Sequence, residues 1–220
     1  AATGEDEGAV GLEGVEGPRL VCADEPHAAD IAVRVGATTY GFAPGSDYQV
    51  VRYTGGRHGS EVELTRAGAP LGTFSLPVPG RHNATNAVAA AALATELGVP
   101  FMDTARALAG FGGVARRFEF RGDLDGVTLI DDYAHLPSEV QAALRTARDG
   151  GWDRVVAVFQ PHRYSRTASL WRDFADAFTD ADLLVLTDVY PAGDAPRPGV
   201  SGRLLVRAVL DAHPAAPVVY

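Results

Sequence analysis

The stretch VVAVFQPHRYSRT, Val155 to Thr167, joins an apolar run to a cluster of polar side chains. The run VVAVF is typical of a fully buried strand, because such strands are short and continuously apolar. One histidine, two arginines, a tyrosine and the hydroxyl groups of a serine and a threonine follow it within eight residues. In open α/β sheets ligands bind at the carboxyl ends of the strands, and arginine binds carboxylate or phosphate with two parallel hydrogen bonds. This stretch therefore predicts an anion site at the end of a buried strand, although a solvated charged loop is the alternative.

The chain around this stretch alternates between predicted strands and helices. The predicted strands are FEFRGDL (118–124), VTLIDDY (127–133), RVVAVFQ (154–160), ADLLVLTDVY (181–190) and the start of another in APVVY (216–220). The predicted helices are SEVQAALRTARDGG (138–151), SLWRDFADAFTDA (169–181) and SGRLLVRAVLDAH (201–213). Strands separated by helices of about a dozen residues form a parallel sheet. We therefore expect an α/β domain over residues 116–220.

Residues 20–115 have a different pattern. A short strand in RLVCADEP (19–26) and a helix in HAADIAVRVG (27–36) precede four segments with period-two patterning, TTYGFA (38–43), YQVVRYTGG (48–56), EVELTRAGA (61–69) and LGTFSLPV (71–78). These segments predict a small, largely antiparallel sheet. An alanine-rich helix (86–99) and a second helix (102–111) follow, and then the glycine-rich GFGGVARR. We expect a domain boundary near residues 112–118, with a hinge near Gly112–Gly113, and a flexible acidic start over residues 1–19.

Composition excludes several classes of protein. The net charge of −9 argues against a nucleic-acid partner, which requires a basic face. No apolar run reaches the roughly 18 residues of a membrane span. A single cysteine, Cys22, excludes an internal disulfide and indicates a cytoplasmic protein. All 19 basic residues are arginine, so the chain has no lysine for a phosphate loop, a Schiff base or a general base.

Two further clusters are candidate sites. In PGRHNATNA (79–87), Asn83 or Asn86 can be explained as a helix cap, but a cap leaves His82 and the second asparagine unexplained. In IDDYAHLPSE (130–139), carboxylates, a phenol and His135 meet at a strand end, where a capped strand-to-helix loop is the alternative. Scattered histidines argue against a metal site, and no GxSxG elbow indicates a serine hydrolase. The residues alone thus predict a nucleotide or anion site shared between two domains.

Taken together, five segments in this order resemble the Mur ligase family: PGRHNATNA, GGVARRFE, DDYAHLPSE, FQPHRYSRT and DVYPAGDAPRPGVSG. The resemblance runs from about Leu20 to the last residue, and the last two segments are similar to those of the alanine-adding members. It implies the end of a central ATPase domain with a small antiparallel sheet, followed by a Rossmann-like C-terminal domain. It also implies ATP-dependent joining of L-alanine to the lactyl carboxylate of UDP-N-acetylmuramate through an acyl phosphate, in peptidoglycan synthesis.

The resemblance also implies a role for individual residues. The adenine and ribose end of ATP would be held by His82, Asn83 and Asn86, and the nucleotide would also contact Arg117 and Asp132. His135 would lie near the phosphates. The alanine and acyl-phosphate end would be faced by Tyr133, His162, Arg163 and Arg166.

Several departures accompany the resemblance. Leu136 stands where the family has a second histidine, and Ala115 stands where a glycine is common. The family's phosphate loop with its lysine, its Mg²⁺-binding glutamate and its UDP-binding domain have no counterpart here. We therefore expect an internal fragment, inactive alone, whose Mg²⁺ ligands lie mostly outside it. The alternatives are a muropeptide-recycling ligase of the same fold and a non-catalytic nucleotide-binding remnant.

Overall fold

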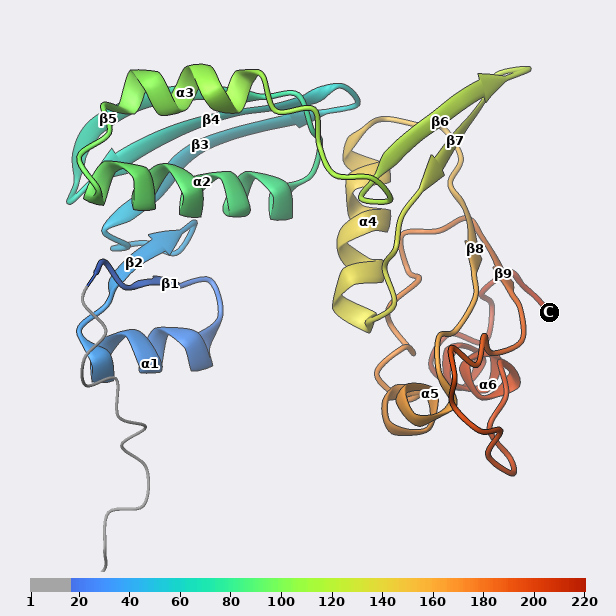
Figure 1. Ribbon diagram of the computed structural model, residues 1–220. Coiled ribbons are helices and arrows are strands. Elements are labelled where there is room, and N and C mark those ends of the chain that lie inside the picture. The colour runs from blue at the N-terminus through green and yellow to red at the C-terminus, as the bar shows by residue number, and fades with distance from the viewer. Residues whose placement is uncertain (1–16) are drawn as a thin grey trace, which may run out of the picture.

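The structure, a computed structural model, describes residues 17–220, so most of the expected flexible start at 1–19 lies outside the described residues. Its elements are arranged in two groups joined by the glycine-rich segment (Figure 1). The strands are β1 (Leu20–Cys22), β2 (Thr38–Gly41), β3 (Tyr48–Gly56), β4 (Gly59–Arg66), β5 (Ala69–Leu76), β6 (Glu119–Leu124), β7 (Val127–Asp131), β8 (Val156–Phe159), β9 (Leu183–Leu186) and β10 (Val218–Val219). The helices are α1 (Pro26–Val35), α2 (Arg81–Glu96), α3 (Phe101–Ala109), α4 (Pro137–Asp149), α5 (Tyr164–Leu170) and α6 (Arg203–Ala212).

The first group contains a five-stranded sheet in the order β1-β2-β3-β4-β5. Only β3, β4 and β5 pair antiparallel, while β1, β2 and β3 run parallel to one another. Alternate residues of β3, β4 and β5 are buried, as the period-two patterning predicts. The sheet is thus mixed, with its antiparallel part where the Gly-containing turns fall.

Helices α2 and α3 cover this sheet and complete its core. The alanine-rich face of α2 packs on the strands, with Ala84, Val88 and Ala91 fully buried. Small side chains let a helix approach a sheet closely, which accounts for an alanine-rich helix in this place. The other end of α2 is tied to the sheet by the Tyr48 hydroxyl, which donates to the Glu96 carboxylate at 2.6 Å.

The second group is built on a three-stranded parallel sheet in the order β10-β9-β8. Phe159, Leu184 and Leu186 on these strands pack with side chains of α4 and α6. The expected α/β domain with a parallel, Rossmann-like sheet is therefore present. The carboxyl ends of β8 and β9 lead directly into the loops at Pro161 and Val189, which places the two loops side by side.

Strands β6 and β7 depart from the expected alternation. They pair only with each other among the described strands, as an antiparallel hairpin, so β7 is not part of the parallel sheet. The cause is the two-residue turn at Asp125–Gly126, where both residues have positive φ (50° and 82°). An Asp-Gly pair is a strong signal for a tight hairpin turn, and it overrides the alternating pattern on either side.

The helix predicted over residues 169–181 is also wrong in its bounds. Helix α5 starts earlier, at Tyr164, and ends at Leu170, and residues 171–180 continue as successive turns. Aspartates in this segment favour local turns over a regular helix. The aromatic residues of this segment still share one buried side, as their spacing predicts: Phe174 and Phe178 are buried, with their rings stacked 6.1 Å apart.

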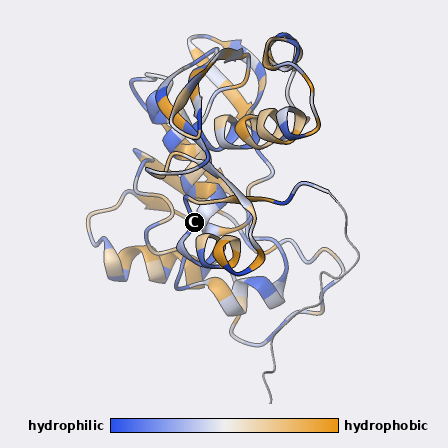
Figure 2. Ribbon diagram, turned by 90° about the vertical axis from the view of Figure 1, so that its left-hand side faces the viewer, coloured by the Kyte–Doolittle hydropathy of each residue, from blue (hydrophilic) through white to orange (hydrophobic). Residues whose placement is uncertain are grey.

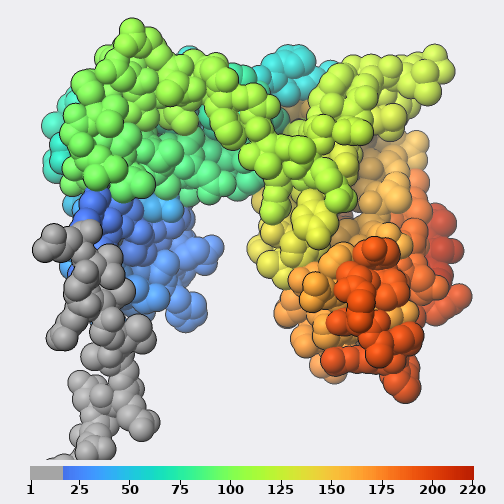
Figure 3. All heavy atoms as spheres, viewed as in Figure 1, coloured from blue at the N-terminus to red at the C-terminus, as the bar shows by residue number. Residues whose placement is uncertain are grey.

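Hydrophobic and hydrophilic residues are mixed along the helices and strands (Figure 2), as expected of elements that bury one side. The space-filling view shows the blue-to-green and the yellow-to-red parts as two lobes that meet at the yellow-green segment (Figure 3). No helix within residues 17–220 is both long and apolar enough to cross a bilayer.

Candidate functional site

The first turns of α2 carry three of the predicted nucleotide-binding residues, His82, Asn83 and Asn86. The helix starts at Arg81 rather than at the predicted Asn86. All three side chains therefore project from one rigid element. Because residues three and four apart lie on the same helix face, Asn86 lies beside both His82 and Asn83.

Neither asparagine caps the helix. Gly80 occupies the N-cap position, and no side-chain hydrogen bond is made there. The Asn83 side chain instead donates to the carbonyl of Pro79 at 2.7 Å, and Asn86 lies well inside the helix. The capping explanation is therefore wrong for this pair of residues.

Gly80 brings the start of α2 against α4. Its φ is +102°, a conformation that side-chain-bearing residues rarely adopt. A Cβ atom at this position would lie 2.6 Å from the Thr146 hydroxyl oxygen in α4. Only glycine allows this approach, which sets the α2 residues opposite the residues of α4.

Asp132 fixes the loop that leaves β7. One carboxylate oxygen accepts the N–H of Phe118 at 2.8 Å, and the other accepts the N–H of Ala134 at 2.7 Å. The N–H of Tyr133 adds a bond of 2.8 Å to the carbonyl of Arg116. Asp132 thereby holds the glycine-rich segment and the loop before α4 in one arrangement.

A pocket of about 720 Å³ opens between these elements. It is lined by Leu76, Val78, His82, Asn83, Asn86, Ala87, Ala90, Leu108, Phe111, Gly113, Val114, Arg117, Asp132, Ser138, Glu139, Ala142 and Ala143. All five predicted nucleotide-binding residues are in this set, although they come from three separate segments of the chain. An apolar pocket with a few convergent polar groups is the usual form of a small-molecule site.

The charges around this pocket are arranged in pairs. Burial lowers the pKa of His82 below its ordinary 6.5; nearby Asp132 opposes this effect and Arg117 adds to it. Burial alone would raise the pKa of Glu139, but the backbone N–H groups of His135 and Leu136, followed by the charges of His135 and Arg117, lower it overall. His82 is thus a neutral hydrogen-bonding group, and Glu139 is a carboxylate 3.6 Å from the Arg117 guanidinium.

The predicted catalytic residues form a second group next to this pocket. The ring of Tyr133 lies 5.2 Å from that of His135 and 6.2 Å from that of His162, and the two imidazole rings are 6.0 Å apart. Arg166 donates from Nη1 to Nδ1 of His162 at 3.0 Å and to the His162 carbonyl at 3.2 Å. Arg163 is the N-cap residue just before α5, with a φ of +71° and an exposed side chain. The structure thus brings these five residues together at the loop after β7, the loop after β8 and the first turn of α5.

Three other residues support the site and are not among the predicted ones. Asp194 accepts the N–H and the hydroxyl of Ser165, at 3.0 and 2.5 Å, and so holds the start of α5. Tyr190 packs against His162 at 5.6 Å, and its carbonyl accepts the Arg163 N–H at 2.8 Å. Glu139 belongs to the segment IDDYAHLPSE (130–139), but its contacts with Arg117 and His135 form only when the loop is folded.

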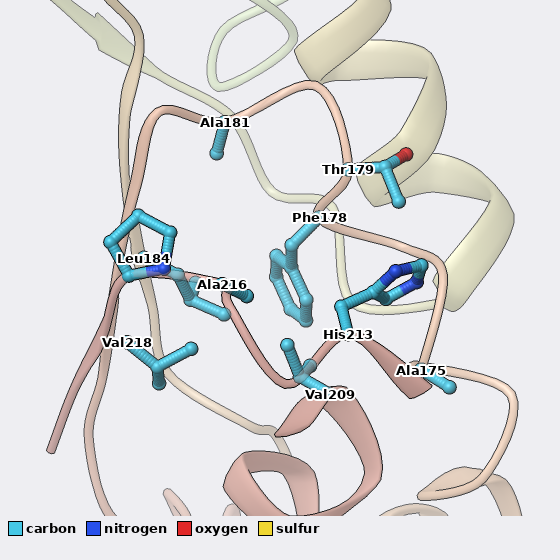
Figure 4. A pocket seen from close by; sticks show the side chains of 10 residues that line it. Ala175, Phe178, Thr179, Ala181, Leu184, Val209, His213, Ala216 and Val218 are labelled. Carbon is cyan, nitrogen blue, oxygen red and sulfur yellow. The ribbon is translucent and has the colours of Figure 1, made fainter. Parts of the chain in front are cut away.

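A second pocket, of about 300 Å³, lies in the C-terminal group (Figure 4). Phe178, Leu184, Val209 and Val218 supply much of its wall. The His213 imidazole, also in the wall, contacts the Asp176 carboxylate at 2.7 Å. This pocket contains none of the predicted site residues and lies near the start of β9, whereas ligands of parallel sheets bind at the carboxyl ends. The larger pocket is therefore the candidate site.

The described residues do not assemble a magnesium site. Within residues 17–220, no group of three or more histidine, cysteine, aspartate or glutamate side chains could hold a metal ion.

The fold and the pocket define a mixed α/β protein with a Rossmann-like C-terminal part and a nucleotide-sized pocket next to it. Residues 116–219 match the family model described as Mur ligase, glutamate ligase domain. The UDP-N-acetylmuramate--L-alanine ligase of Anaeromyxobacter sp. (strain Fw109-5) is 45% identical over 195 residues, which are 88% of this chain and 43% of that protein. The chain belongs to the Mur ligase family.

Other relatives agree with this assignment. The UDP-N-acetylmuramate--L-alanine ligase of Synechocystis sp. is 48% identical over 174 residues, which are 77% of this chain and 34% of that protein. The crystal structure of the UDP-N-acetylmuramate-alanine ligase MurC from Thermotoga maritima has a TM-score of 0.71 at 28% identity, over 86% of this chain and 40% of that one. The chain spans less than half the length of these relatives.

Proposed function

We propose that this chain supplies the adenine-, ribose- and amino-acid-binding part of an ATP-dependent ligase. The ligase would join L-alanine to the lactyl carboxylate of UDP-N-acetylmuramate through an acyl phosphate, in the cytoplasmic synthesis of peptidoglycan precursors. The observation that carries this proposal is the convergence of His82, Asn83, Asn86, Arg117 and Asp132 on one pocket of about 720 Å³. Relatives that carry this activity in their names are 43–48% identical to the chain.

The pocket offers suitable chemistry for the adenosine end of ATP. Leu76, Val78 and Ala87 provide apolar walls, and Asn83 and Asn86 provide amide donors and acceptors for a base or a ribose. Both Asp132 oxygens already accept backbone N–H groups, and each retains a second lone pair for a hydroxyl group. Arg117 is only loosely paired at 3.6 Å, so its guanidinium can turn to an anionic ligand.

The adjoining group of residues suits the amino acid and the acyl phosphate. Arg163 and Arg166 lie at the carboxyl end of β8, and guanidinium groups match carboxylate and phosphate geometry. The rings of Tyr133, His135 and His162 lie 5.2 to 6.2 Å from one another, and His162 contacts Arg166. Positioned cations stabilise the charge that develops in phosphoryl and acyl transfer. We also propose that residues 20–115 and 116–220 act as two domains with a hinge near Gly112–Gly113.

The nucleotide part of this proposal is tested by calorimetric titration of the chain with ADP. Asn86→Ala removes one hydrogen-bonding group of about 1 kcal/mol, so the affinity should fall roughly fivefold. Thr85→Ala is the matched control, because Thr85 lies on the same helix, bonds to the Arg81 carbonyl at 3.1 Å and does not line the pocket. Equal affinities of the two variants, or no binding by the unmodified chain, would contradict the proposal.

A further inference from the structure

His135 and His162 face each other at the junction of the two loops, with ring centroids 6.0 Å apart. Each imidazole makes a hydrogen bond through Nδ1 to a group of fixed polarity. A partner that can only donate or only accept settles which nitrogen carries the proton. The protonation of this pair can therefore be read from its contacts.

The contact of His162 requires a neutral ring. Arg166 Nη1 lies 3.0 Å from His162 Nδ1, and a guanidinium always donates and never accepts. His162 Nδ1 must therefore be the acceptor, and the single ring proton lies on Nε2. The second bond from Arg166, to the His162 carbonyl at 3.2 Å, holds the guanidinium in this position.

The contact of His135 has the opposite polarity. Its Nδ1 lies 2.9 Å from the carbonyl oxygen of Tyr133, and a carbonyl can only accept. Nδ1 therefore carries a proton, and Nε2 has a free lone pair whenever the ring is neutral. The Glu139 carboxylate lies 3.3 Å from the same Nδ1, so it stabilises the ring after Nε2 has taken up a proton.

We propose that the two histidines have opposite roles: His135 is the catalytic residue that accepts a proton at Nε2, and His162 is a neutral hydrogen-bond donor through Nε2–H. This assignment rests on the proposed ligase function. The alanine ammonium must lose a proton before it can attack, and His135 Nε2 accepts that proton. The amine then adds to the acyl carbon and forms the C–N bond, and the resulting tetrahedral intermediate collapses by breaking the bond from that carbon to the phosphate oxygen. The second proton leaves the nitrogen with the departing phosphate, while His162 donates a hydrogen bond to an oxygen of the acyl phosphate.

Charged and polar groups from every neighbouring element bear on this pair. They are Tyr133 and Glu139 on the β7–α4 side, Arg163 and Arg166 at the start of α5, and Tyr190 and Asp194 in the loop after β9. Burial lowers the pKa of His162; Arg166, Arg163 and His135 add to this effect, and Asp194 opposes it. The surroundings thus favour the neutral ring that the Arg166 contact requires.

The test is a long-range ¹H–¹⁵N correlation spectrum of the ¹⁵N-labelled chain, recorded from pH 8 to pH 5 without ligands. We expect His162 to show the Nε2–H form and to remain neutral at a lower pH than an ordinary histidine. His135 should show the Nδ1–H form that its contact with the Tyr133 carbonyl requires. Observing His162 as Nδ1–H or as a cation at neutral pH, or His135 as Nε2–H, would overturn the assignment.

Variants separate the Arg166 contact from a general effect of charge. Arg166→Met should convert His162 to a mixture of both neutral forms and raise its pKa. Arg163→Met is the matched control, because it removes a charge next to His162 but leaves the Nδ1 contact, so the Nε2–H form should persist. If Arg166→Met disturbs the fold, the spectra of the unmodified chain still decide the outcome. The spectra are recorded without nucleotide, so they test the roles of the two histidines separately from the ligase proposal. Failure of the chain to bind ADP would contradict the ligase proposal, whereas ring protons on the other nitrogens would contradict the division of roles.

Discussion

Arg166 combines two functions at a single residue. Its Nη1 fixes His162, and its remaining N–H groups are available to an anion at the end of β8. Lysine would keep the charge but could not reproduce the planar arrangement of donors. Arg166 is therefore the residue at which the anion-binding proposal is most sensitive to a conservative change.

We expect Arg166→Lys to lower alanine-dependent turnover by roughly 10²–10³, because one charge-assisted contact to a developing anion is lost. The measurement requires a hybrid ligase in which this chain replaces the matching part of the Anaeromyxobacter relative. Nucleotide binding should stay nearly normal, since other residues hold that end. Arg172→Lys is the control, because the Arg172 side chain is exposed and stacks on Trp171. Unchanged alanine kinetics would show that the polar stretch after β8 is a solvated loop with no role in anion binding.

His82 should make the stability of the protein depend on pH. Its pKa is lowered by burial in the folded chain and returns to about 6.5 on unfolding. As the pH falls below about 6.5, the unfolded chain takes up a proton that the folded chain resists, so the free energy of unfolding decreases. His82→Gln should therefore lose less stability between pH 7.5 and pH 5.5 in urea unfolding. A variant of the exposed His58, His58→Gln, should behave like the unmodified chain; equal pH dependence in all three would refute this role of burial.

Individual candidate site residues could be proposed from the sequence only where they belong to a recognisable motif. The five predicted nucleotide-binding residues and the five predicted catalytic residues all belong to the motifs found in the sequence, and the structure places them in two adjoining groups. Asp194 and Tyr190 also lie in a quoted segment, but their roles depend on a contact between two loops that are far apart in sequence. Spacing along a chain carries no information about such a contact.

At the scale of elements, the approach of α2 to α4 shapes the pocket. The contact depends on Gly80, whose positive φ and lack of a side chain place the α2 start against Thr146. Helix α4 in turn starts at Pro137, and Glu139 accepts the N–H groups of His135 and Leu136 at 2.9 and 3.1 Å. The first turns of α2 and α4 therefore fix the position of one wall of the pocket.

Gly80→Ala should destabilise the protein by about 2 kcal/mol or more, because the new methyl group meets the Thr146 hydroxyl in a strained backbone conformation. Gly112→Ala is the matched control: no heavy atom lies within 4 Å of its added Cβ and its φ is not positive. Urea unfolding of both variants measures the difference. Equal stability of Gly80→Ala and the unmodified chain would show that α2 and α4 are not held together at this point.

The sequence predicted the kinds of elements better than their pairing and bounds. Apolar periodicity located the parallel strands and most helices, because burial of one face is a local property of a segment. The pairing of β6 with β7 was missed although its turn signal, Asp125–Gly126, is present in the sequence. The early start of α2 was missed because no side-chain hydrogen bond caps it at Gly80 and mostly polar residues fill its first turns, before the alanine-rich run.

At the scale of the whole molecule, two hydrophobic cores are linked by a few specific contacts. One core lies between β3–β5 and the helices α2 and α3, and the other surrounds β8 and β9. Arg57, in the β3–β4 turn, donates to the carbonyls of Gly150 and Gly151 at 3.3 and 3.2 Å and stacks 4.3 Å from the Trp152 ring. The proposed boundary near residues 112–118 would allow the cores to move relative to each other once such contacts break.

The pocket between these two cores is the proposed nucleotide site. The most direct measurement is a titration of the ¹⁵N-labelled chain with ADP, followed by backbone and side-chain amide shifts. A nucleotide site in this pocket predicts saturable shifts at the Asn83 and Asn86 side chains and at the backbone of Arg117 and Asp132, with none around Phe178 and Val209 in the smaller pocket. Shifts confined to the smaller pocket, or no saturable shift at any residue, would contradict it.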